Sequence, residues 1–337
     1  MVTYIVRRLI GAVLTLLIVS IITFGIFYLV PRWVGASAAD RASRYVGRTA
    51  NAEQVTAAVK ALGLDKPFYV QYWSWLKAIF VGADVNTGTA IDHCPAPCLG
   101  YSFIGRNPVW SDLLDRLPVT GSLAAGAAII WLLSGVAIGV LSALRRGSVF
   151  DRAAMGLALG GVSLPIFWTG IVCLVIFSYG AGWTAPGGAY TPIEQNPAQW
   201  AYDLLLPWIT LALLFSAAYA RLTRAGMLET MGEDYIRTAR AKGLREHTVV
   251  TRHGLRAALT PIVTIFGLDV GLLLGGAVLT ESTFSLPGLG KYAIDGITAS
   301  DMPKVMGVTL LAAFFVVIAN LIVDVLYAVI DPRVRLG

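Results

Sequence analysis

Charged side chains are scarce in this chain of 337 residues. Asp, Glu, Lys and Arg together make up 14% of the sequence, whereas soluble domains carry about 25%. Apolar residues make up 56%, and they stand in long uninterrupted runs. A single water-soluble core does not require such runs, so the composition excludes an ordinary soluble domain and favours a membrane protein.

The signatures of enzymes are also missing. No G-x-x-x-x-G-K-[ST] motif exists, because Tyr292 follows Gly290-Lys291 and Ser285 stands five positions before Gly290. The chain is therefore predicted not to hydrolyse nucleotide by itself. No H-E-x-x-H motif occurs, and no nucleophile–base pair stands within the apolar runs. The histidines do not cluster on these runs: His93, His247 and His253. We predict no catalytic residue, no metal ligand and no cofactor of the chain's own.

Six apolar runs are long enough to cross the ~30 Å hydrocarbon layer of a membrane. They cover residues 9–30, 119–144, 153–180, 204–220, 257–280 and 305–330. Backbone exposed to lipid must satisfy its hydrogen bonds within its own segment, which favours helices over open sheet. The runs also lack the alternation of ~10-residue barrel strands. The sequence therefore predicts an all-α polytopic membrane protein with six transmembrane helices.

The first run could instead belong to a signal peptide. Arg7 and Arg8 precede it, and Ala36-Ser37-Ala38 resembles a cleavage site. The run at 9–30 is longer than the roughly 7–15 apolar residues of such a peptide, however. We therefore retain it as a membrane span.

Basic residues are distributed unequally among the loops. Residues 181–203 contain none, whereas the loop after the second run, residues 221–256 and the C-terminal tail are rich in them: Arg145, Arg146, Arg152, Arg221, Arg224, Arg237, Arg240, Lys242, Arg245, Arg252, Arg256, Arg333 and Arg335. The positive-inside rule places these loops and both termini in the cytoplasm. We therefore expect three parts: the N-terminal segment and first span (1–30), an extracytoplasmic segment (31–116), and a five-helix core with a cytoplasmic loop at 221–256 (117–337).

The extracytoplasmic segment is predicted to contain a helix at 52–62 and a cluster of aromatic residues suited to a membrane interface. The cluster consists of Tyr69, Tyr72, Trp73 and Trp75.

Cysteine is rare, since the chain has three. Cys94 and Cys98 lie close together on the predicted outer side, where disulfides persist, so we predict a bridge between them. Two free thiols, or half of a metal site with His93, are the alternatives. Cys173 stands within a span and is expected to be an inert core residue.

Residues 232–243 have the marks of a short surface helix. Glu233 and Asp234 begin it, basic residues end it, and Gly243 suits a C-terminal cap. A favourable pair between Glu233 and Arg237 is expected. Composition alone leaves two interpretations open: a solvated connector, or a docking element for a partner.

This loop reads Tyr235-Ile236-Arg237-Thr238-Ala239-Arg240-Ala241-Lys242-Gly243-Leu244, followed by Arg252-His253-Gly254-Leu255-Arg256. It resembles the E-A-A-x-x-x-G loop of ABC importer permeases in its peptide-transporter form. Other blocks resemble the same family, and together they extend over nearly the whole chain: 4–9, 62–67, 141–146, 163–168, 281–290 and 324–333. The chain is similar to the "B"-type subunit of the dipeptide, oligopeptide and nickel permease family.

The resemblance implies the type I ABC importer permease fold, in which this loop is a coupling helix seated in a groove of an ATPase subunit. Arg237, Thr238 and Ala239 occupy the E-A-A places, and Gly243 occupies the place of the glycine. The first two places hold Arg and Thr, so side-chain contacts cannot be copied from other branches. The residues that the resemblance assigns to ATPase coupling are Asp234, Tyr235, Arg237, Thr238, Ala239, Lys242 and Gly243.

The resemblance also implies partners. A second homologous permease would form a heterodimer with this chain in the bacterial plasma membrane. Two ATPase domains or subunits would bind ATP and magnesium, and an extracytoplasmic binding protein would deliver the substrate. Peptide is the default substrate of the family, but nickel and haem importers share the scaffold. The rival functions are a passive channel, for which no filter is evident, and a membrane-embedded enzyme, for which the catalytic pair is missing.

Two of the predicted spans contain acids. Asp269 stands opposite a stripe of small residues that suits close helix packing (Gly267, Gly271 and Gly275). An intramembrane carboxylate faces a cavity or a partner. Asp269 therefore either lines the translocation path or makes a structural hydrogen bond to another helix. In the sixth span, Asn320 and Asp324 form a polar stripe, and the resemblance gives it an architectural role.

Overall fold

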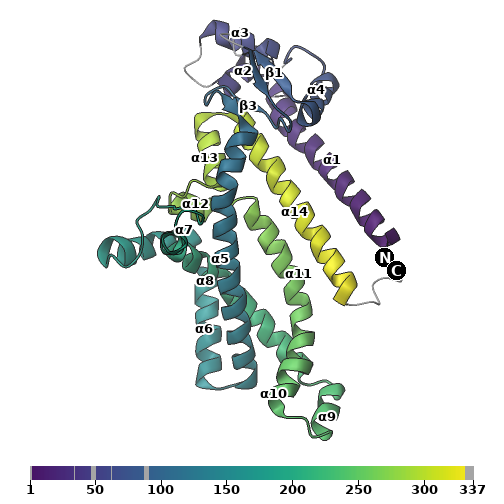
Figure 1. Ribbon diagram of the computed structural model, residues 1–337, viewed down its shortest axis with the longest axis vertical. Helices are drawn as coiled ribbons and strands as arrows, with labels where there is room; N and C mark the ends of the chain where they lie inside the picture. The colour runs from purple at the N-terminus through teal and green to yellow at the C-terminus, as the bar shows by residue number, and fades with distance from the viewer. Residues whose placement is uncertain (1, 34, 47–50, 62, 87–90, 331–337) are drawn as a thin grey trace. The chain divides into compact units, whose positions relative to one another are not determined.

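The computed structural model describes residues 2–33, 35–46, 51–61, 63–86 and 91–330. Residue 62 of the predicted helix 52–62 lies outside these ranges, as do residues 331–337 with Arg333 and Arg335. The chain forms two compact units, drawn in Figure 1. The first combines Met1–Thr120, Leu274–Ser282 and Pro287–Leu321. The second combines Gly121–Leu273, Thr283–Leu286 and Ile322–Gly337.

Five helices among the described residues are long and apolar enough to cross a membrane. They are Val6–Val30, Val109–Leu144, Pro197–Thr230, Glu246–Leu274 and Met302–Val325. The first lies in α1 (Val2–Trp33), the second is α5, the third is α8, and the last lies in α14 (Met302–Ile330). The fourth runs through α10 (Glu246–Thr248), the π-helix η2 (Val249–Gly254) and α11 (Leu255–Leu274). The prediction of an all-α polytopic membrane protein is confirmed.

The third predicted span, 153–180, is not a continuous helix, and this part of the prediction is wrong. It is divided into α6 (Val149–Ser163), α7 (Ile166–Cys173) and the π-helix η1 (Leu174–Gly180), with a bend of 102° between the halves. Pro165 gives the physical reason, because a proline lacks a backbone N–H and disfavours the helical conformation of the residue before it. Leu164 accordingly is extended, with φ −89° and ψ 131°. Counted as one broken crossing, the pair supplies a sixth span.

The fourth and fifth predicted spans have other bounds than expected. Residues 204–220 are the inner part of the longer helix α8 (Pro197–Thr230), which begins early because the Asn196 side chain caps it. The fifth run, 257–280, is interrupted where α11 ends, and α12 (Val278–Thr283) follows. Gly276 in this break has φ 122°, and a Cβ there would meet the backbone of Gly290. Only glycine therefore permits this close approach without strain.

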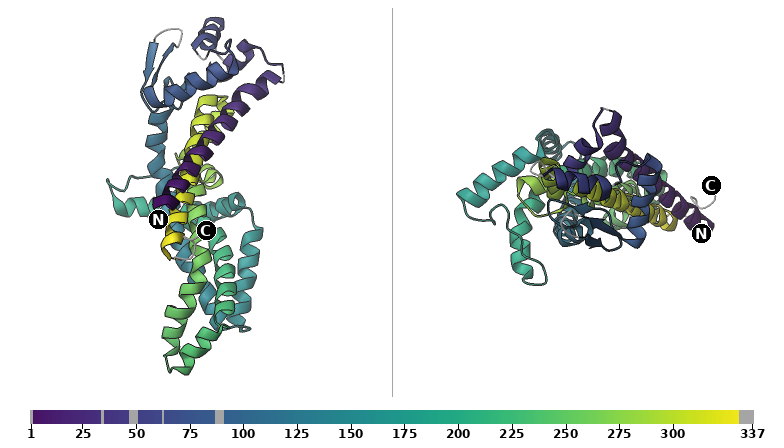
Figure 2. Two further views of the ribbon diagram at one scale, coloured as in Figure 1. Left: turned by 90° about the vertical axis from the view of Figure 1, so that its right-hand side faces the viewer. Right: turned by 90° about the horizontal axis from the view of Figure 1, so that it is seen from above.

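In the first unit, three short helices gather at the C-terminal end of α1 (Figures 1 and 2). They are α2 (Ala38–Val46), α3 (Ala52–Ala61) and α4 (Phe68–Val81). In its described part, α3 confirms the predicted helix at 52–62. A cluster of buried apolar side chains joins α1, α2, α3, α4 and the start of α14.

Aromatic rings dominate that cluster. Phe24 is fully buried and stacks on Tyr28, with ring centroids 3.9 Å apart. Tyr72 and Trp75 of α4 lie against Phe24, at 5.4 and 5.3 Å between centroids. The predicted interfacial cluster is therefore divided by the helix: Tyr72 and Trp75 face this core, whereas Tyr69 and Trp73 are exposed.

Two small antiparallel hairpins complete the first unit. Strand β1 (Ala83–Asn86) pairs with β2 (Ile91–Cys94), and β3 (Tyr101–Ser102) pairs with β4 (Asn107–Pro108). Directly after β4, α5 (Val109–Leu144) begins. Its first turns form a second core with α13 (Leu289–Ala299) and α14, in which Val109, Leu113 and Leu289 are fully buried.

In the second unit, α5 packs closely on α8, and α6 lies along the same helix. The close approach depends on glycines of α5. A Cβ added to Gly135 would lie 2.6 Å from Cβ of Tyr219, and one added to Gly139 would lie 2.5 Å from Cβ of Thr223. Small residues allow helix backbones to approach in this way within a membrane, where van der Waals contact supplies much of the attraction between helices.

Adding a methyl group at this contact is expected to separate the two helices. We predict that Gly139→Ala lowers the thermal unfolding midpoint of the purified protein in detergent, with a cost of about 1–3 kcal/mol from overpacking. Gly156→Ala in α6 is the control, since no atom lies within 4 Å of the position of its Cβ. Because alanine is the better helix former, the control should be neutral or gain about 0.5–1 kcal/mol. Equal midpoints for the two variants would contradict this packing.

Candidate functional site

The helix α9 (Asp234–Ala241) is the core of the predicted coupling loop. It is packed down by one face, because Ile236 and Ala239 are three residues apart and point the same way. Both are buried, and they form a small apolar cluster with Val249 of η2 and with Met231. A helix of eight residues is marginal by itself, so this contact fixes its position.

The opposite face of α9 is open. Six of the seven residues that were assigned to coupling are exposed: Asp234, Tyr235, Arg237, Thr238, Lys242 and Gly243. Ala239, the third of the E-A-A places, instead faces inward and contacts the small cluster. The structure therefore brings the assigned residues together on one short element, but it gives Ala239 a packing role.

The end of α9 has a specific cap. Gly243 has φ 76°, the left-handed conformation expected from its place in the sequence. Its N–H donates to Arg240 O at 2.9 Å, and Leu244 N–H donates to Ala239 O at 3.3 Å. These two bonds make a Schellman motif, which satisfies carbonyl groups that the helix end would leave unpaired. No atom lies within 4 Å of a Cβ added at Gly243, so glycine is needed there for its backbone conformation and not for space.

Two ion pairs accompany this cap. Arg240 forms a two-bond pair with Glu246 of α10, at 3.1 and 2.7 Å, which ties the residues after Gly243 back to α9. Arg237 lies 3.2 Å from Asp234, where the sequence analysis expected Glu233. Glu233 is instead the extended cap residue before the helix, with ψ 149°, and its carbonyl oxygen accepts a bond from the Arg237 N–H at 3.3 Å.

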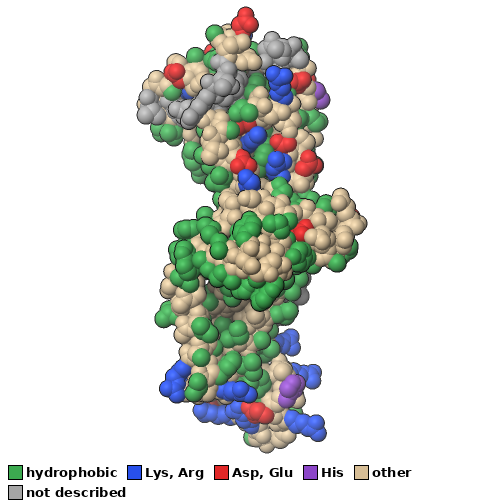
Figure 3. Space-filling model, turned by 90° about the vertical axis from the view of Figure 1, so that its left-hand side faces the viewer, with side chains coloured by type: hydrophobic (Ala, Val, Ile, Leu, Met, Phe, Trp, Pro, Cys, Tyr) green, Lys and Arg blue, Asp and Glu red, His purple; other side chains and the backbone are tan. Residues whose placement is uncertain are grey.

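Lys and Arg side chains gather at the end of the second unit that carries α9 and the α5–α6 turn (Figure 3). Exposed basic residues lie in the α5–α6 turn, at the start of α6, in α9 and the residues after it, and in η2: Arg145, Arg146, Arg152, Arg237, Arg240, Lys242, Arg245 and Arg252. Several long apolar helices therefore end at a basic surface.

The sequence is similar to known proteins along nearly its whole length, and these similarities identify its family. Residues 135–336 match the family described as "Binding-protein-dependent transport system inner membrane component", and residues 1–124 match its N-terminal companion. A protein of Brucella abortus (strain 2308), named as a peptide transport system permease, is 40% identical over 99% of both chains. The dipeptide transport system permease protein DppB of Escherichia coli (strain K12) is 37% identical, and the di/tripeptide permease DppB of Pseudomonas aeruginosa (strain UCBPP-PA14) is 38% identical. The matches to the Escherichia coli and Pseudomonas aeruginosa proteins also cover 99% of both chains.

The chain belongs to this family of inner-membrane permeases. It is the transmembrane permease subunit of an ABC importer and not an enzyme. Membership implies, in general terms, a partner permease, an ATPase and a binding protein. The family match from 135 to 336 includes α9 and the basic surface around it.

Within the spans of the permease, Asp269 has a defined partner. Its Oδ2 accepts a hydrogen bond from Tyr219 Oη at 2.8 Å. Tyr219 is buried beside Trp131, with ring centroids 6.2 Å apart, and Asp269 itself is half-buried. The structural hydrogen bond that the sequence offered as one interpretation of Asp269 is therefore present.

The structure shows contacts or burial for residues of the predicted glycine stripe of α11 and the predicted polar stripe of α14. A Cβ at Gly267 would collide with Val323 of α14, so this glycine does serve close packing. Gly271 is buried, and Gly275 lies just beyond the end of α11. Asn320 is exposed and Asp324 is half-buried on α14.

Glu281 in α12 is fully buried, and its role was not predicted from the sequence. Its Oε1 accepts from Thr120 Oγ1 at 2.8 Å, and its Oε2 accepts from the Lys291 N–H at 3.0 Å. The Thr120 hydroxyl in turn accepts from the Leu289 N–H at 2.9 Å. Burial raises the pKa of Glu281, while these donors oppose the shift. Gly288 leaves room for the carboxylate, since a Cβ there would collide with it.

This carboxylate joins α5, α12 and α13 of the first unit. The signal that could have identified it is that Glu281 is the one charged residue in the stretch 270–290 and is followed by closely spaced glycines. The block 281–290 was recognised only as part of the family resemblance.

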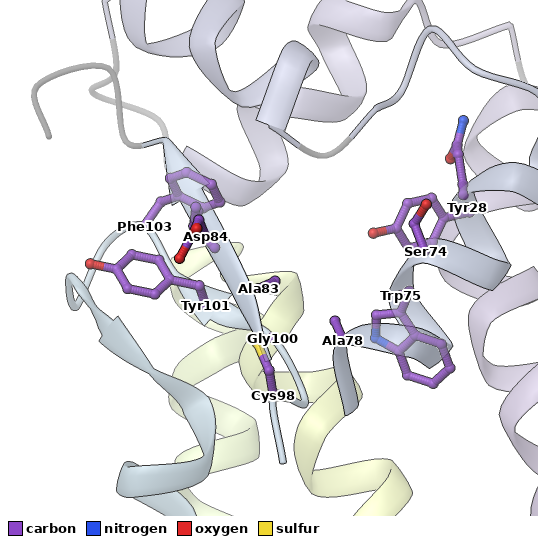
Figure 4. A pocket seen from close by; sticks show the side chains of 12 residues that line it. Tyr28, Ser74, Trp75, Ala78, Ala83, Asp84, Cys98, Gly100, Tyr101 and Phe103 are labelled. Carbon is purple, nitrogen blue, oxygen red and sulfur yellow. The ribbon is translucent and has the colours of Figure 1, made fainter. Parts of the chain in front are cut away.

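The first unit also carries the cysteine pair and a cavity. Cys94 and Cys98 form a disulfide with their Cα atoms 5.6 Å apart, and both are buried. A cavity of about 170 Å³ lies next to Cys98. Figure 4 shows Tyr28 and Trp75 on one side of it and Tyr101 and Phe103 on the other. The disulfide therefore stabilises one wall of this cavity. Cys173 in α7 is half-buried and is not part of a disulfide.

We predict that Cys94 and Cys98 of the protein isolated from its native membrane resist alkylation until a reductant is added. The reason is that the two sulfurs are bonded in the structure and that the segment 31–116 is expected on the extracytoplasmic side, where disulfides persist. Mass spectrometry of iodoacetamide-treated protein measures this directly, and Cys173 in denaturant is the internal control for a reactive thiol. If both thiols are alkylated without reductant, the bridge does not exist in the cell.

Proposed function

We propose that this chain is one of two permease subunits that form the translocation path of a peptide importer. The observation that carries the proposal is the similarity along 99% of the chain to proteins that are named as peptide, dipeptide and di/tripeptide transport permeases. No comparable observation favours nickel or haem. In this proposal an extracytoplasmic binding protein delivers the peptide, and two ATPase domains drive alternating access.

The proposed orientation follows from charge. The basic end of the second unit lies in the cytoplasm, because short loops rich in Lys and Arg remain on that side. Both termini then lie in the cytoplasm as well, and residues 31–116 with the disulfide lie outside.

In this proposal α9 is the coupling helix. Three features support it: α9 is held by a buried face, its other face is open, and its end is fixed by the cap at Gly243. A connector needs none of these. An element that transmits force to a partner needs all three, because a mobile helix would absorb the movement of the ATPase instead of passing it on.

The cap at Gly243 gives a sharp test. We expect Gly243→Val to insert and purify normally but to assemble poorly with the ATPase or to lose stimulation of ATP hydrolysis. A β-branched residue in the left-handed conformation costs on the order of 1–2 kcal/mol, which is enough to deform the end of α9. Co-purification and the ATPase rate of the assembled complex measure the effect.

Gly182→Val is the matched control for that experiment. Gly182 also has a positive φ, 68°, and open space around it, but it lies in the loop 181–203 that contains no basic residue. The same strain at Gly182 should leave assembly and hydrolysis unchanged. A Gly243→Val complex that transports peptide at the wild-type rate would show that α9 is only a connector.

We further propose that Asp269 lines the translocation path, where its carboxylate would meet the amino group of a peptide. Asp269→Asn is expected to lower peptide uptake about tenfold or more, as hydrogen bonds to charged groups contribute about 1.5–3 kcal/mol. The asparagine can still accept the bond from Tyr219, so the unfolding midpoint should change little.

Tyr219→Phe separates the two roles of this pair, because it removes the hydrogen bond and leaves the carboxylate. It should lower the unfolding midpoint and leave uptake largely intact. If Asp269→Asn instead lowers the midpoint and leaves uptake unchanged, Asp269 has only a structural role.

A further inference from the structure

A buried ion pair in the second unit joins α6 to α8. Arg224 of α8 donates to Asp151 of α6 through two bonds, Nε to Oδ1 at 2.6 Å and Nη2 to Oδ2 at 2.8 Å. The Asp151 side chain is 4% exposed and that of Arg224 is 26% exposed. Two parallel bonds between guanidinium and carboxylate fix both distance and angle, which a single contact does not.

Asp151 also holds the turn that joins α5 to α6. Its Oδ2 accepts from the Gly147 N–H at 2.9 Å, and its own N–H donates to the Ser148 hydroxyl at 3.2 Å. Gly147 has φ 79°, so the turn has one defined shape. One carboxylate therefore binds the α5–α6 turn and Arg224 of α8 at the same time.

Arg224 lies shortly before α8 ends at Thr230, and the chain then leads into α9. Met227 of α8 is fully buried against Ala143 of α5, Val250 of η2 and Ala258 of α11. Met231 contacts this cluster and also the cluster beneath α9. From α9 to the end of α5, the side chains are thus in continuous contact.

The apolar cluster around Met227 holds α8 to α5, η2 and α11, and α6 lies along α8 beside it. Apolar side chains can slide over one another by repacking, whereas a two-bond ion pair that is largely removed from water has one geometry. Breaking it leaves each charge without the partner that fixes its position. The pair is therefore suited to keep α6 and its turn in register with α8.

We propose that Asp151 and Arg224 are positioning residues for transport: the pair makes the α5–α6 turn move together with α8 when α9 is displaced. This inference rests on the proposed role of α9 as the coupling helix. It assigns a function to two residues through their contact with each other.

The test uses the assembled importer with its own ATPase and its own binding protein, supplied with a casein peptide digest. The variants are Asp151→Asn, Arg224→Gln and the double variant. Each complex should assemble and keep its basal rate of ATP hydrolysis. Stimulation by the loaded binding protein should fall about tenfold in both single variants, since couplings between sites are commonly 5- to 150-fold. The double variant should be no worse than either single one, because all three lose the same interaction.

Two further variants test whether the loss of a positive charge alone explains the effect. Arg221→Gln takes the same charge from an exposed position of α8 and should behave like the wild type. Arg224→Lys keeps the charge but not the fork of two bonds, and should give an intermediate stimulation.

The outcomes are distinct from those that test α9. A photo-crosslink from Tyr235 to the ATPase should persist in the pair variants, since docking does not depend on them. Wild-type stimulation in both single variants, losses that add in the double variant, or complexes that no longer assemble would each overturn the positioning role. If the wild-type protein itself gives no crosslink, the coupling role of α9 fails instead.

Discussion

The contact of α9 with η2 is the interaction on which the position of α9, the proposed coupling helix, depends. Ile236, Ala239 and Val249 bury a small apolar surface together with Met231, and without it α9 would be too short to persist. The same contact turns the exposed residues, from Tyr235 to Lys242, to the side away from the bundle. Because Met231 also packs on the end of α8, the helix is part of the transmembrane body and not a free loop.

The bilayer explains why the rest of the second unit is built as it is. Lipid gives little drive for helices to associate, so close contact must come from shape and from a few polar bonds. Gly135 and Gly139 supply the shape, and Tyr219 with Asp269 supplies one of the bonds. In the first unit the buried carboxylate of Glu281 likewise holds segments together, because it accepts hydrogen bonds from Thr120, Ala277 and Lys291.

The long apolar runs predicted most of the membrane-spanning helices, because the apolar residues of a span lie next to one another in the sequence. The break at Pro165 and the early end of α11 were not predicted. The length of an apolar run does not show where the backbone bends within it. In the site, the cap at Gly243 was predictable from local chemistry. The inward direction of Ala239, the Arg224–Asp151 pair and the burial of Glu281 were not, because each depends on residues brought together by the fold.

The most direct test of the account is a photo-crosslink from the open face of α9. With a benzophenone amino acid in place of Tyr235, the assembled importer should give a crosslinked product with the ATPase subunit. The same probe in place of Trp183, which is 71% exposed in the loop without basic residues, should give no such product. An ATPase crosslink from position 183, or none from position 235 in a complex that hydrolyses ATP and transports peptide, would contradict both the proposed orientation and the coupling role.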